Sequence, residues 1–297
     1  MLREQACHPV QVERLASEEA GFVLPFLDAW LRADVAWSLA DEYPGVFDRH
    51  GDVHHYVIRA GGDRLLAHAA VRMLHVETGG GRLPIRMVGS VVVHPEARNR
   101  GLGSRLMTGI ASEFRQSEDG LCILWSDREV FYERAGFKRF GREWSLKLRL
   151  APEAGESGIR PYESGDLVAL LMMHLQKPVH VRRSHRHFER LLCIPRSRTF
   201  VLEEGGFPIA YASVGKGLDF LDVVHESGGE DSSLSRLLQG LPRHLGKPVT
   251  LLLPPWRASL AESLVPHAEE AWLQHLGLAI ANGPVPGDFY LEGFDSI

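Results

Sequence analysis

The residues best suited to chemistry lie where a run of valines gives way to two closely spaced glycines. Three β-branched residues in succession indicate a buried strand: Val91, Val92 and Val93. A helix is predicted next, with Gly101 and Gly103 in its first turn. A helix start offers unpaired N–H groups at the positive end of the helix dipole, and glycine lets a phosphate oxygen approach the backbone closely. The stretch therefore predicts a diphosphate site.

The predicted helix has one apolar face that would hold it against a sheet. Its apolar residues recur at helical spacing: Leu102, Leu106, Met107, Ile110, Ala111 and Phe114. Arg98 and Arg100 add positive charge beside the glycines. We call the residues predicted to surround the diphosphate the cradle: Asn99, Arg100, Gly101, Leu102, Gly103 and Ser104.

Two classes of nucleotide-binding fold could use such a turn. The dinucleotide fingerprint G-x-G-x-x-G follows the first strand of its domain and has an acidic residue about 20 positions later. Here Leu106 stands at the third glycine position, and a loop containing Pro95 separates the strand from the glycines. The motif also lies deep in the first half of the chain. These departures count against a dinucleotide site.

The spacing R-x-x-G-x-G, which begins at Arg98 after Val-Val-Val-His-Pro, instead resembles the coenzyme A motif of the GCN5-related N-acetyltransferase (GNAT) superfamily. A second resemblance lies in residues 124–137, where Phe131 and Tyr132 head an F-Y-x-x-x-G-F run. In this family the tyrosine of that run faces the thioester. The two motifs stand in the family's order, about 30 residues apart. The resemblance covers residues 1–150.

The resemblance implies an α/β fold with a mixed, mostly antiparallel central sheet flanked by helices. It implies acetyl-CoA as cosubstrate, held by the cradle, Arg98 and Phe131, and it implies no metal. The strand of three valines would pair with the pantetheine arm and aim a backbone N–H at the thioester oxygen. Tyr132 would protonate the thiolate as it leaves, because a positioned phenol of pKa about 10 can donate to the thiolate of a thiol whose pKa is about 8.5.

The amine acceptor side of the site is less sharply defined. Four aromatic residues could shape a pocket or fill the core: Trp37, Tyr43, Phe47 and Trp125. An acidic loop would suit a cationic acceptor and contains Asp41, Glu42 and Asp48. The base that takes the amine proton stays open among a water chain and five side chains, each of which could equally be a solvated surface residue: Glu42, Asp127, Glu129, His54 and His55.

Several reactive residue types have simpler explanations. Tyr132 could instead be a core aromatic packed between Val130 and Phe137. Cys122 lies within an apolar strand, so a small buried side chain is expected there rather than a nucleophile. Three clustered histidines match no standard zinc spacing and predict a solvated basic segment: His180, His185 and His187.

The composition is that of an ordinary globular enzyme. The chain has 297 residues, of which 44% are hydrophobic and 24% charged, so it can form two modest domains. A net charge of −5 and a pI near 6.3 argue against a nucleic-acid partner, and no apolar run reaches the roughly 18 residues of a membrane span. The three cysteines form no disulfide framework, and the start of the chain lacks a signal-peptide core. We expect a reduced, cytoplasmic protein whose assembly state, a homo-oligomer included, is open.

Residues 151–158 have the composition of a linker, Ala-Pro-Glu-Ala-Gly-Glu-Ser-Gly. We therefore predict a catalytic GNAT domain at 1–150, closed by residues 137–150, and a second GNAT-like domain at 159–297. The second half repeats the first, with an offset of 131 residues at two of four matches. The matched ranges are 56–62 with 200–206, 92–94 with 223–225, 104–110 with 235–241, and 131–137 with 272–278.

The second copy lacks the groups that would bind and react. The glycines and arginines of the first copy are replaced by Ser232, Leu234, Gly229 and Asp231. Leu234 would block a diphosphate sterically, and Glu230 and Asp231 would repel it. Leu273 stands where the first copy has Tyr132, so no phenol proton is available. We expect a degenerate domain that supplies packing surface and one wall of the acceptor cleft.

These observations predict an N-acetyltransferase that moves an acetyl group from acetyl-CoA directly to a primary amine. The acceptor would be a small molecule or a peptide, without nucleic acid or membrane, and the predicted contacts with it are Glu42, Tyr43, Trp125 and Asp127. The alternative is a non-catalytic module that senses acyl-CoA, which would share the cradle but would not need Tyr132. The fold alone does not set the acceptor.

Overall fold

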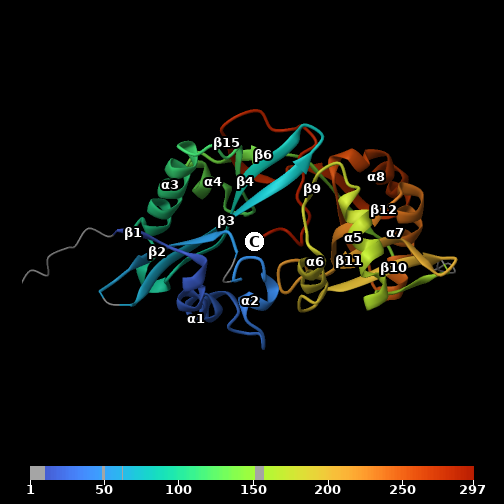
Figure 1. The fold of residues 1–297 in the computed structure, drawn as a ribbon, viewed down its shortest axis with the longest axis horizontal. Coiled ribbons are helices and arrows are strands. Elements are labelled where there is room, and N and C mark those ends of the chain that lie inside the picture. The colour runs from blue at the N-terminus through green and yellow to red at the C-terminus, as the bar shows by residue number, and fades with distance from the viewer. Residues whose placement is uncertain (1–10, 49–50, 62, 151–156) are drawn as a thin grey trace, which may run out of the picture.

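The computed structural model describes residues 11–48, 51–61, 63–150 and 157–297. Two sheets lie side by side, each flanked by helices (Figure 1). Neighbouring strands are antiparallel except for β4 with β5 and β12 with β13. This mixed, mostly antiparallel α/β architecture confirms the predicted fold class. Among the described residues, no helix has the length and apolarity needed to cross a bilayer.

The first sheet has eight strands in the order β1-β2-β3-β4-β5-β15-β6, with β9 added beside β3. Its strands are β1 (Val12–Leu15), β2 (Val53–Arg59), β3 (Leu65–Thr78), β4 (Gly81–Val93), β5 (Leu121–Leu124), β6 (Lys138–Phe140), β9 (His180–Val181) and β15 (Gly277–Ala281). The helices of this half are α1 (Ala20–Leu31), α2 (Leu39–Glu42), α3 (Leu102–Arg115) and α4 (Glu129–Glu133). Apolar residues of α3 cover one face, and those of α1 and α2 cover the other.

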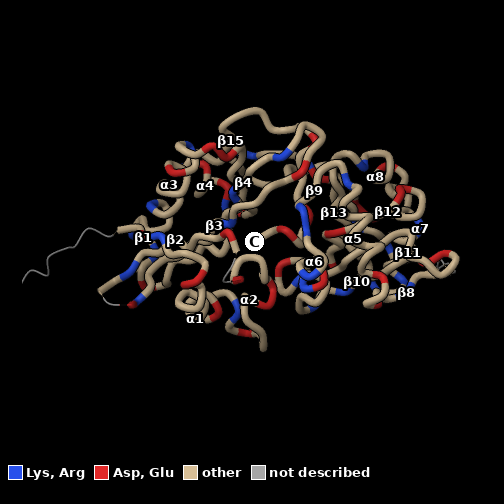
Figure 2. The backbone as a smooth tube through the Cα atoms, viewed as in Figure 1, with Lys and Arg blue, Asp and Glu red and all other residues tan. Residues whose placement is uncertain are grey.

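The second sheet has seven strands in the order β14-β7-β13-β12-β11-β10-β8. Its strands are β7 (Glu143–Leu148), β8 (Ile159–Pro161), β10 (Arg198–Glu204), β11 (Phe207–Val214), β12 (Val223–Gly229), β13 (Val249–Leu253) and β14 (Ala268–Gln274). Its helices are α5 (Leu167–Leu175), α6 (His185–Leu192), α7 (Asp231–Leu245) and α8 (Ala258–Leu264). Acidic and basic residues are interspersed along both halves (Figure 2).

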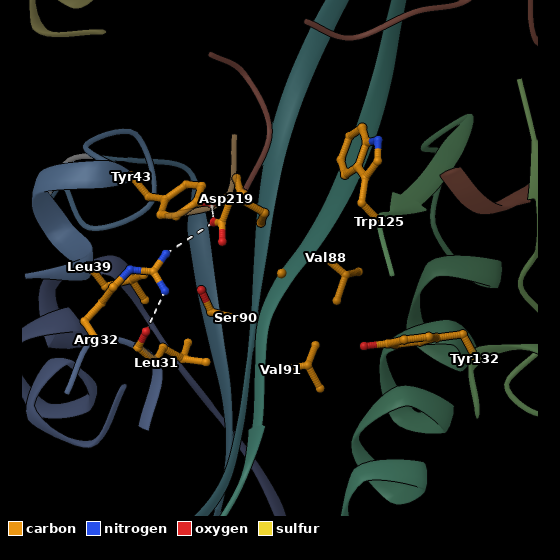
Figure 3. Close-up of a pocket in the computed structure, with 12 residues that line it drawn as sticks. Leu31, Arg32, Leu39, Tyr43, Val88, Ser90, Val91, Trp125, Tyr132 and Asp219 are labelled. Atoms are coloured by element: carbon orange, nitrogen blue, oxygen red, sulfur yellow. Dashed lines mark hydrogen bonds and ion pairs between the residues drawn. The ribbon is translucent and has the colours of Figure 1, made fainter. Parts of the chain in front are cut away.

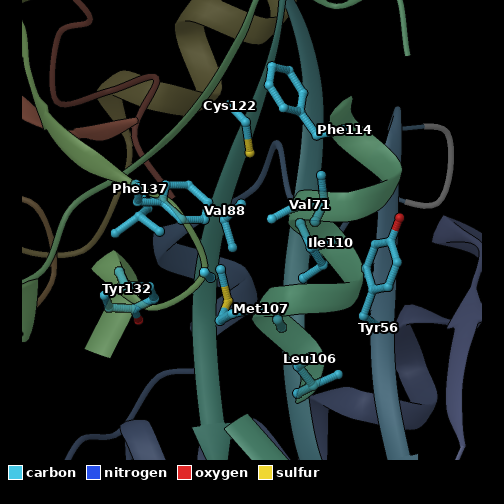
Figure 4. Packing of buried hydrophobic residues seen from close by; sticks show 14 of the residues in the cluster. Tyr56, Val71, Val88, Leu106, Met107, Ile110, Phe114, Cys122, Tyr132 and Phe137 are labelled. Carbon is cyan, nitrogen blue, oxygen red and sulfur yellow. The ribbon is translucent and has the colours of Figure 1, made fainter. Parts of the chain in front are cut away.

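Helix α3 packs as its sequence predicts. All six residues of the expected apolar face are buried, and they meet the sheet in one hydrophobic cluster (Figure 4). Helix α7 buries the matching positions of the second half, Leu237, Leu238 and Leu241, at the predicted offset of 131. The predicted offset of 131 residues is therefore correct for α3 and α7.

The two halves exchange a strand. β7 precedes the predicted boundary but pairs with β13 and β14 of the second sheet. β15, from the end of the chain, pairs with β5 and β6 of the first sheet, where Figure 1 shows its red ribbon among green ones. The expectation that residues 137–150 close the first half is therefore wrong for β7. β7 is largely buried, and its sequence does not say which partner strand it pairs with.

The fourth repeat match is also wrong. Residues 272–274 belong to strand β14, whereas residues 131–133 belong to helix α4. The first α-helix after β13, as α4 is the first after β5, is α8. Leu273 is thus not the counterpart of Tyr132. Residues 258–264 of α8 contain no tyrosine, so the second half still lacks a phenol at this place.

Candidate active site

Strand β4 separates from β5 where a pocket opens. The two strands pair only from Ile85 opposite Leu121 to Met87 opposite Ile123. The next four residues of β4 line the pocket (Figure 3) together with eight others. The lining residues are Val88, Gly89, Ser90, Val91, Trp125, Tyr132, Leu31, Arg32, Leu39, Tyr43, Asp219 and Ile297. Of the three predicted valines, Val91 faces this pocket, whereas Val92 packs in the core beneath α1.

A bulge in β4 shapes the floor of the pocket. Gly89 pairs with Ala70 and Val92 with His68, so Ser90 and Val91 together face the single residue Ala69 of β3. Ser90 has a φ of 49°, which is uncommon for a residue other than glycine. The backbone of β4 is therefore turned out of its regular ladder next to Val91.

The cradle presents backbone rather than side chains at the start of α3. Gly101 is the N-cap of α3 with a φ of 75°, a conformation that favours glycine. A Cβ atom at Gly101 would meet no other atom within 4 Å, so open space borders the helix start. No side chain caps α3, and Asn99 is also left-handed with a φ of 62°. The N–H groups of the first turn are thus available to an anion, and the cradle suits a diphosphate.

Three other predicted coenzyme contacts also hold the local structure together. A Cβ atom at Gly103 would lie 3.1 Å from Cζ of Phe131 and 3.4 Å from Cγ2 of Val93. Gly103 therefore lets α3 approach α4 and β4, a second reason for glycine beside phosphate access. Arg98 donates from Nε to the carbonyl of Val93 at 3.3 Å, so its side chain ties the cradle loop to β4. Arg100 is exposed on this loop, and Ser104 is half-buried in the first turn of α3.

Tyr132 lies both in the core of the first half and at the pocket. Its ring packs edge-on against Phe131 at 4.8 Å and against Phe137 at 6.2 Å, within the core cluster. Its hydroxyl points across the pocket towards Val91 (Figure 3). Burial raises the pKa of Tyr132 above its ordinary value, so the phenol carries its proton at neutral pH. The group can therefore act as a proton donor at the pocket.

The predicted acceptor residues separate into two groups. Tyr43 and Trp125 line the pocket, whereas Asp127 is exposed outside it. Glu42 is fully buried and accepts hydrogen bonds from Arg32 and from Nε1 of Trp37. Glu42 is thus a structural counter-ion and not an acceptor contact.

The remaining acidic and aromatic candidates also lie outside the pocket lining. Asp48 accepts from Arg190 at 2.7 Å, and Phe47 stacks on His55 at 5.7 Å. Asp41 caps the start of α2 by accepting from the backbone of Ser38. The acidic loop therefore contributes no carboxylate to the acceptor side of the pocket.

The other base candidates likewise do not line the pocket. His55 is fully buried and paired with His68, and burial lowers its pKa to about 4. Glu129 is paired with Arg139 at 2.7 Å, and His54 lies outside the lining. Cys122 is buried in β5 with its pKa raised to about 12 by burial, as expected for an inert thiol.

Sequence reasoning missed Arg32, Asp219 and Ile297. Tyr43 donates its hydroxyl hydrogen to Asp219, and Arg32 donates to the same carboxylate at 3.2 Å. Asp219 belongs to the turn between β11 and β12, so the second half forms part of the pocket wall. The backbone oxygen of Ile297 would lie 2.5 Å from a Cβ atom at Gly89, so the chain passes directly over the β4 bulge. No local motif marks these residues.

The corresponding place in the second half is filled. β12 pairs with β13 only at Val223 and Val224, and Glu226 then lies in the opening. This buried carboxylate accepts from Tyr211 at 2.9 Å, from Lys177 at 3.0 Å and from Arg183. His174, Glu226 and Glu292 are close enough to share a metal ion, but the Lys177 ammonium already donates to both carboxylates.

The second half also lacks a cradle. Residues 94–101 lie between β4 and α3, whereas Glu230 alone lies between β12 and α7. The loop that would surround a diphosphate is therefore missing, and not merely altered in sequence. The three clustered histidines lie in two elements, His180 in β9 and His185 and His187 at the start of α6. His185 is exposed, and the other two are half-buried.

Comparison with known proteins agrees with this description. The sequence model of the Acetyltransferase (GNAT) domain family matches residues 34–140. A mycothiol acetyltransferase of Saccharopolyspora erythraea is 26% identical over 147 residues, which are 45% of this chain and 46% of that protein. The chain thus matches slightly less than half the length of this curated relative.

Solved structures share the fold at low sequence identity. A probable N-acyltransferase of unknown function from Enterococcus faecalis V583 has a TM-score of 0.69 at 13% identity, covering 93% of this chain and 73% of that one. A tandem GNAT protein from the clavulanic acid biosynthesis pathway has a TM-score of 0.54 at 17% identity, covering 93% of this chain and all of the other. Residues 34–140 therefore match the GNAT domain family, and the chain as a whole shares its fold with solved structures that include a tandem GNAT protein.

Proposed function

We propose that this protein transfers an acetyl group from acetyl-CoA directly to a primary amine, without a covalent enzyme intermediate. The observation that carries the proposal is the opening of β4 away from β5, which leaves the bulge at Ser90 and the side chain of Tyr132 on one pocket, while the uncapped start of α3 packs on Phe131 next to Tyr132. This arrangement suits a thioester whose diphosphate binds at one end and whose acetyl group reacts at the other. The resemblance of both motifs to the GNAT family supports it.

The cradle and β4 would hold the coenzyme. The diphosphate accepts hydrogen bonds from the backbone of residues 99–104 at the positive end of α3. The pantetheine arm lies along Val91, Val92 and Val93, as an added strand would. Phe131 packs against Gly103 and so fixes the distance between α3 and α4 at this end of the site.

The chemistry needs one electrostatic and one acidic group. A neutral amine attacks the thioester carbonyl, negative charge develops on its oxygen, and a backbone N–H of the β4 bulge stabilises that charge. The C–S bond then breaks as the C–N bond is completed, and Tyr132 gives its proton to the departing sulfur. The attacking nitrogen gives up its extra proton to water, and the phenolate of Tyr132 takes a proton back from water.

The pocket favours a cationic small-molecule or peptide amine. Arg32 and Glu42 neutralise each other, and the carboxylate of Asp219 adds one further negative charge on the pocket side. The side chain of Asp219 is 45% exposed, so an ammonium group can reach it. Trp125 and Tyr43 supply the aromatic walls.

The first half would carry the activity and the second half would be a degenerate copy. The single-residue link before α7 offers no cradle, and a network of buried side chains around Glu226 lies where β12 and β13 stop pairing. The second half then acts through Asp219 in the pocket and through the exchanged strand β15.

Replacing Tyr132 with phenylalanine tests the proposal. We expect turnover of acetyl-CoA, followed as thiol release with spermidine, kanamycin and a peptide bearing a free α-amine, to fall by roughly 10²-fold because the general acid is lost. The affinity for acetyl-CoA measured by calorimetry should not change, and Tyr162→Phe in the second half should leave turnover intact.

The rival functions give different results in the same assay. Tight binding of acetyl-CoA by the unaltered protein without turnover on any amine would favour the acyl-CoA sensor. Stabilisation against heat by a nicotinamide dinucleotide, but not by coenzyme A, would favour the dinucleotide site.

A further inference from the structure

The bulge of β4 is held by a buried histidine. Nδ1 of His68, on the adjacent strand β3, lies 2.8 Å from the carbonyl oxygen of Ser90. His68 is fully buried, and it faces the bulge at the point where the register of β3 and β4 breaks. The carbonyl is therefore drawn towards β3 by a side chain and not by the regular ladder.

The proton positions follow from the partners. A carbonyl oxygen can only accept, so Nδ1 of His68 carries a hydrogen and donates it. Burial lowers the pKa of His68 to about 3, so the ring is neutral and its Nε2 accepts. Nδ1 of His55 lies 3.0 Å from that Nε2 and donates to it. The two rings thus form one directed chain that ends on Ser90.

This chain cannot relay protons into the pocket, because it ends on a carbonyl that has no proton to pass on. At its other end, Nε2 of His55 is buried with no hydrogen-bond partner among the described residues. The ring of His55 stacks on Phe47 at 5.7 Å, which fixes its plane. The His55–His68 pair is therefore suited to holding the Ser90 carbonyl in one position.

The held carbonyl lies next to the N–H of Val91, at the end of the pocket where the thioester would react. In a trans peptide the C=O and the following N–H point in opposite directions, and none of the described peptide bonds is cis. Holding the Ser90 carbonyl towards β3 directs the N–H of Val91 away from β3, on the side where β4 has left β5. Ser90 and Val91 both line the pocket.

We propose that His68, oriented by His55, is a positioning residue that aims the N–H of Val91 at the thioester carbonyl. This inference rests on the proposed acetyl transfer. In the transition state the carbonyl oxygen gains negative charge, and a donor that is already oriented stabilises that charge without reorganisation. His68 itself touches neither coenzyme nor acceptor.

Two substitutions of nearly equal shape separate positioning from packing. His68→Asn keeps an N–H donor close to the place of Nδ1, whereas His68→Leu removes it. With acetyl-CoA and the best of the three amines named above, we expect His68→Leu to lower kcat on the order of 10²-fold with little change in KM for acetyl-CoA. His68→Asn should retain most of the kcat. His75→Leu, at an exposed position of the same strand, is the matched control and should behave as the unaltered protein.

Each outcome decides one of the two proposals. Equal losses in the Asn and Leu variants would mean that the ring only fills space, and no loss in either would mean that the bulge keeps its shape unaided; both results overturn the positioning role. If the unaltered protein itself neither binds nor consumes acetyl-CoA, the proposed function fails and the inference falls with it. Should His68→Leu not fold, His55→Phe tests the same chain from its far end, and an unchanged kcat there overturns the orienting role of His55.

Discussion

Asp219 gives the acceptor pocket its charge. Only one of its oxygens, Oδ2, is engaged by Tyr43 and Arg32 among the described residues, so the other can receive an ammonium group. The Tyr43 hydroxyl keeps its proton, because burial and the nearby Asp219 raise its pKa well above the ordinary value. Arg32 is paired with Glu42, and the amine of Lys216, whose pKa burial lowers to about 7, lies 4.4 Å from the centre of the Tyr43 ring. Asp219 is the carboxylate of this group that lines the pocket.

Asp219→Asn should weaken the use of cationic acceptors. A hydrogen bond to a charged group contributes about 1.5–3 kcal/mol, and 1.4 kcal/mol is a tenfold change, so we expect KM for spermidine to rise about tenfold or more. Affinity for acetyl-CoA should stay the same. Asp222→Asn, in the same turn but paired with Lys247, is the control. An unchanged KM for spermidine in the Asp219 variant would show that the acceptor charge is met elsewhere.

Single residues differ in how far the sequence reveals them. Tyr132, Gly101 and Gly103 stand at short spacings within motifs, so their places at the pocket and the cradle could be predicted. Asp219 lies 176 positions from the tyrosine that it accepts from, and only the fold brings the two together. Glu42 shows the converse, because its acidic character was visible but its buried partner Arg32 was not.

At the scale of elements, the coenzyme end of the site depends on how closely α3 approaches α4. Gly103 and Phe131 are in contact across this interface, and Phe131 in turn packs edge-on against Tyr132. A change at Gly103 is therefore transmitted through one aromatic ring to the proposed general acid. The apolar face of α3 fixes the other side of the helix against the sheet.

Gly103→Ala should disturb both binding and catalysis. Its Cβ would press on Phe131, and overpacking of this kind costs about 1–3 kcal/mol, so we expect acetyl-CoA affinity to fall roughly tenfold and kcat to fall with it. Gly109→Ala in the same helix meets no atom within 4 Å and should stabilise the protein by about 0.5–1 kcal/mol without changing binding. Equal coenzyme affinity in the two variants would contradict this account of the α3–α4 contact.

The elements themselves were predictable where their apolar period was long. The six-residue face of α3 and its repeat in α7 span several turns, so one register fits and others fail. The stretch at 272–278 was too short for its apolar residues to distinguish a strand from a helix. A glycine near its end made it resemble residues 131–137. The true counterpart, α8, lies near the offset of 131 that relates α7 to α3, whereas the match of 131–137 with 272–278 used an offset of 141.

At the scale of the whole molecule, the two halves are built into each other. β7 lies between β13 and β14 of the second sheet, and β15 lies between β5 and β6 of the first. The final residues add a further link, since Lys216 donates to the carbonyl oxygens of Gly293 and Ser296. Local sequence predicts each strand but not its partner, so the exchange of strands across the predicted boundary at 150 could not be read from it.

The central claim is that backbone N–H groups at the start of α3 bind a diphosphate and that the second copy has lost this site. Titration calorimetry of the full chain with acetyl-CoA tests it most directly. We expect one molecule bound per chain, and we expect Gly101→Val to abolish the heat because a β-branched residue is strained at a φ of 75°. Two molecules bound per chain, no heat at all, or undiminished binding by the Gly101 variant would contradict the claim.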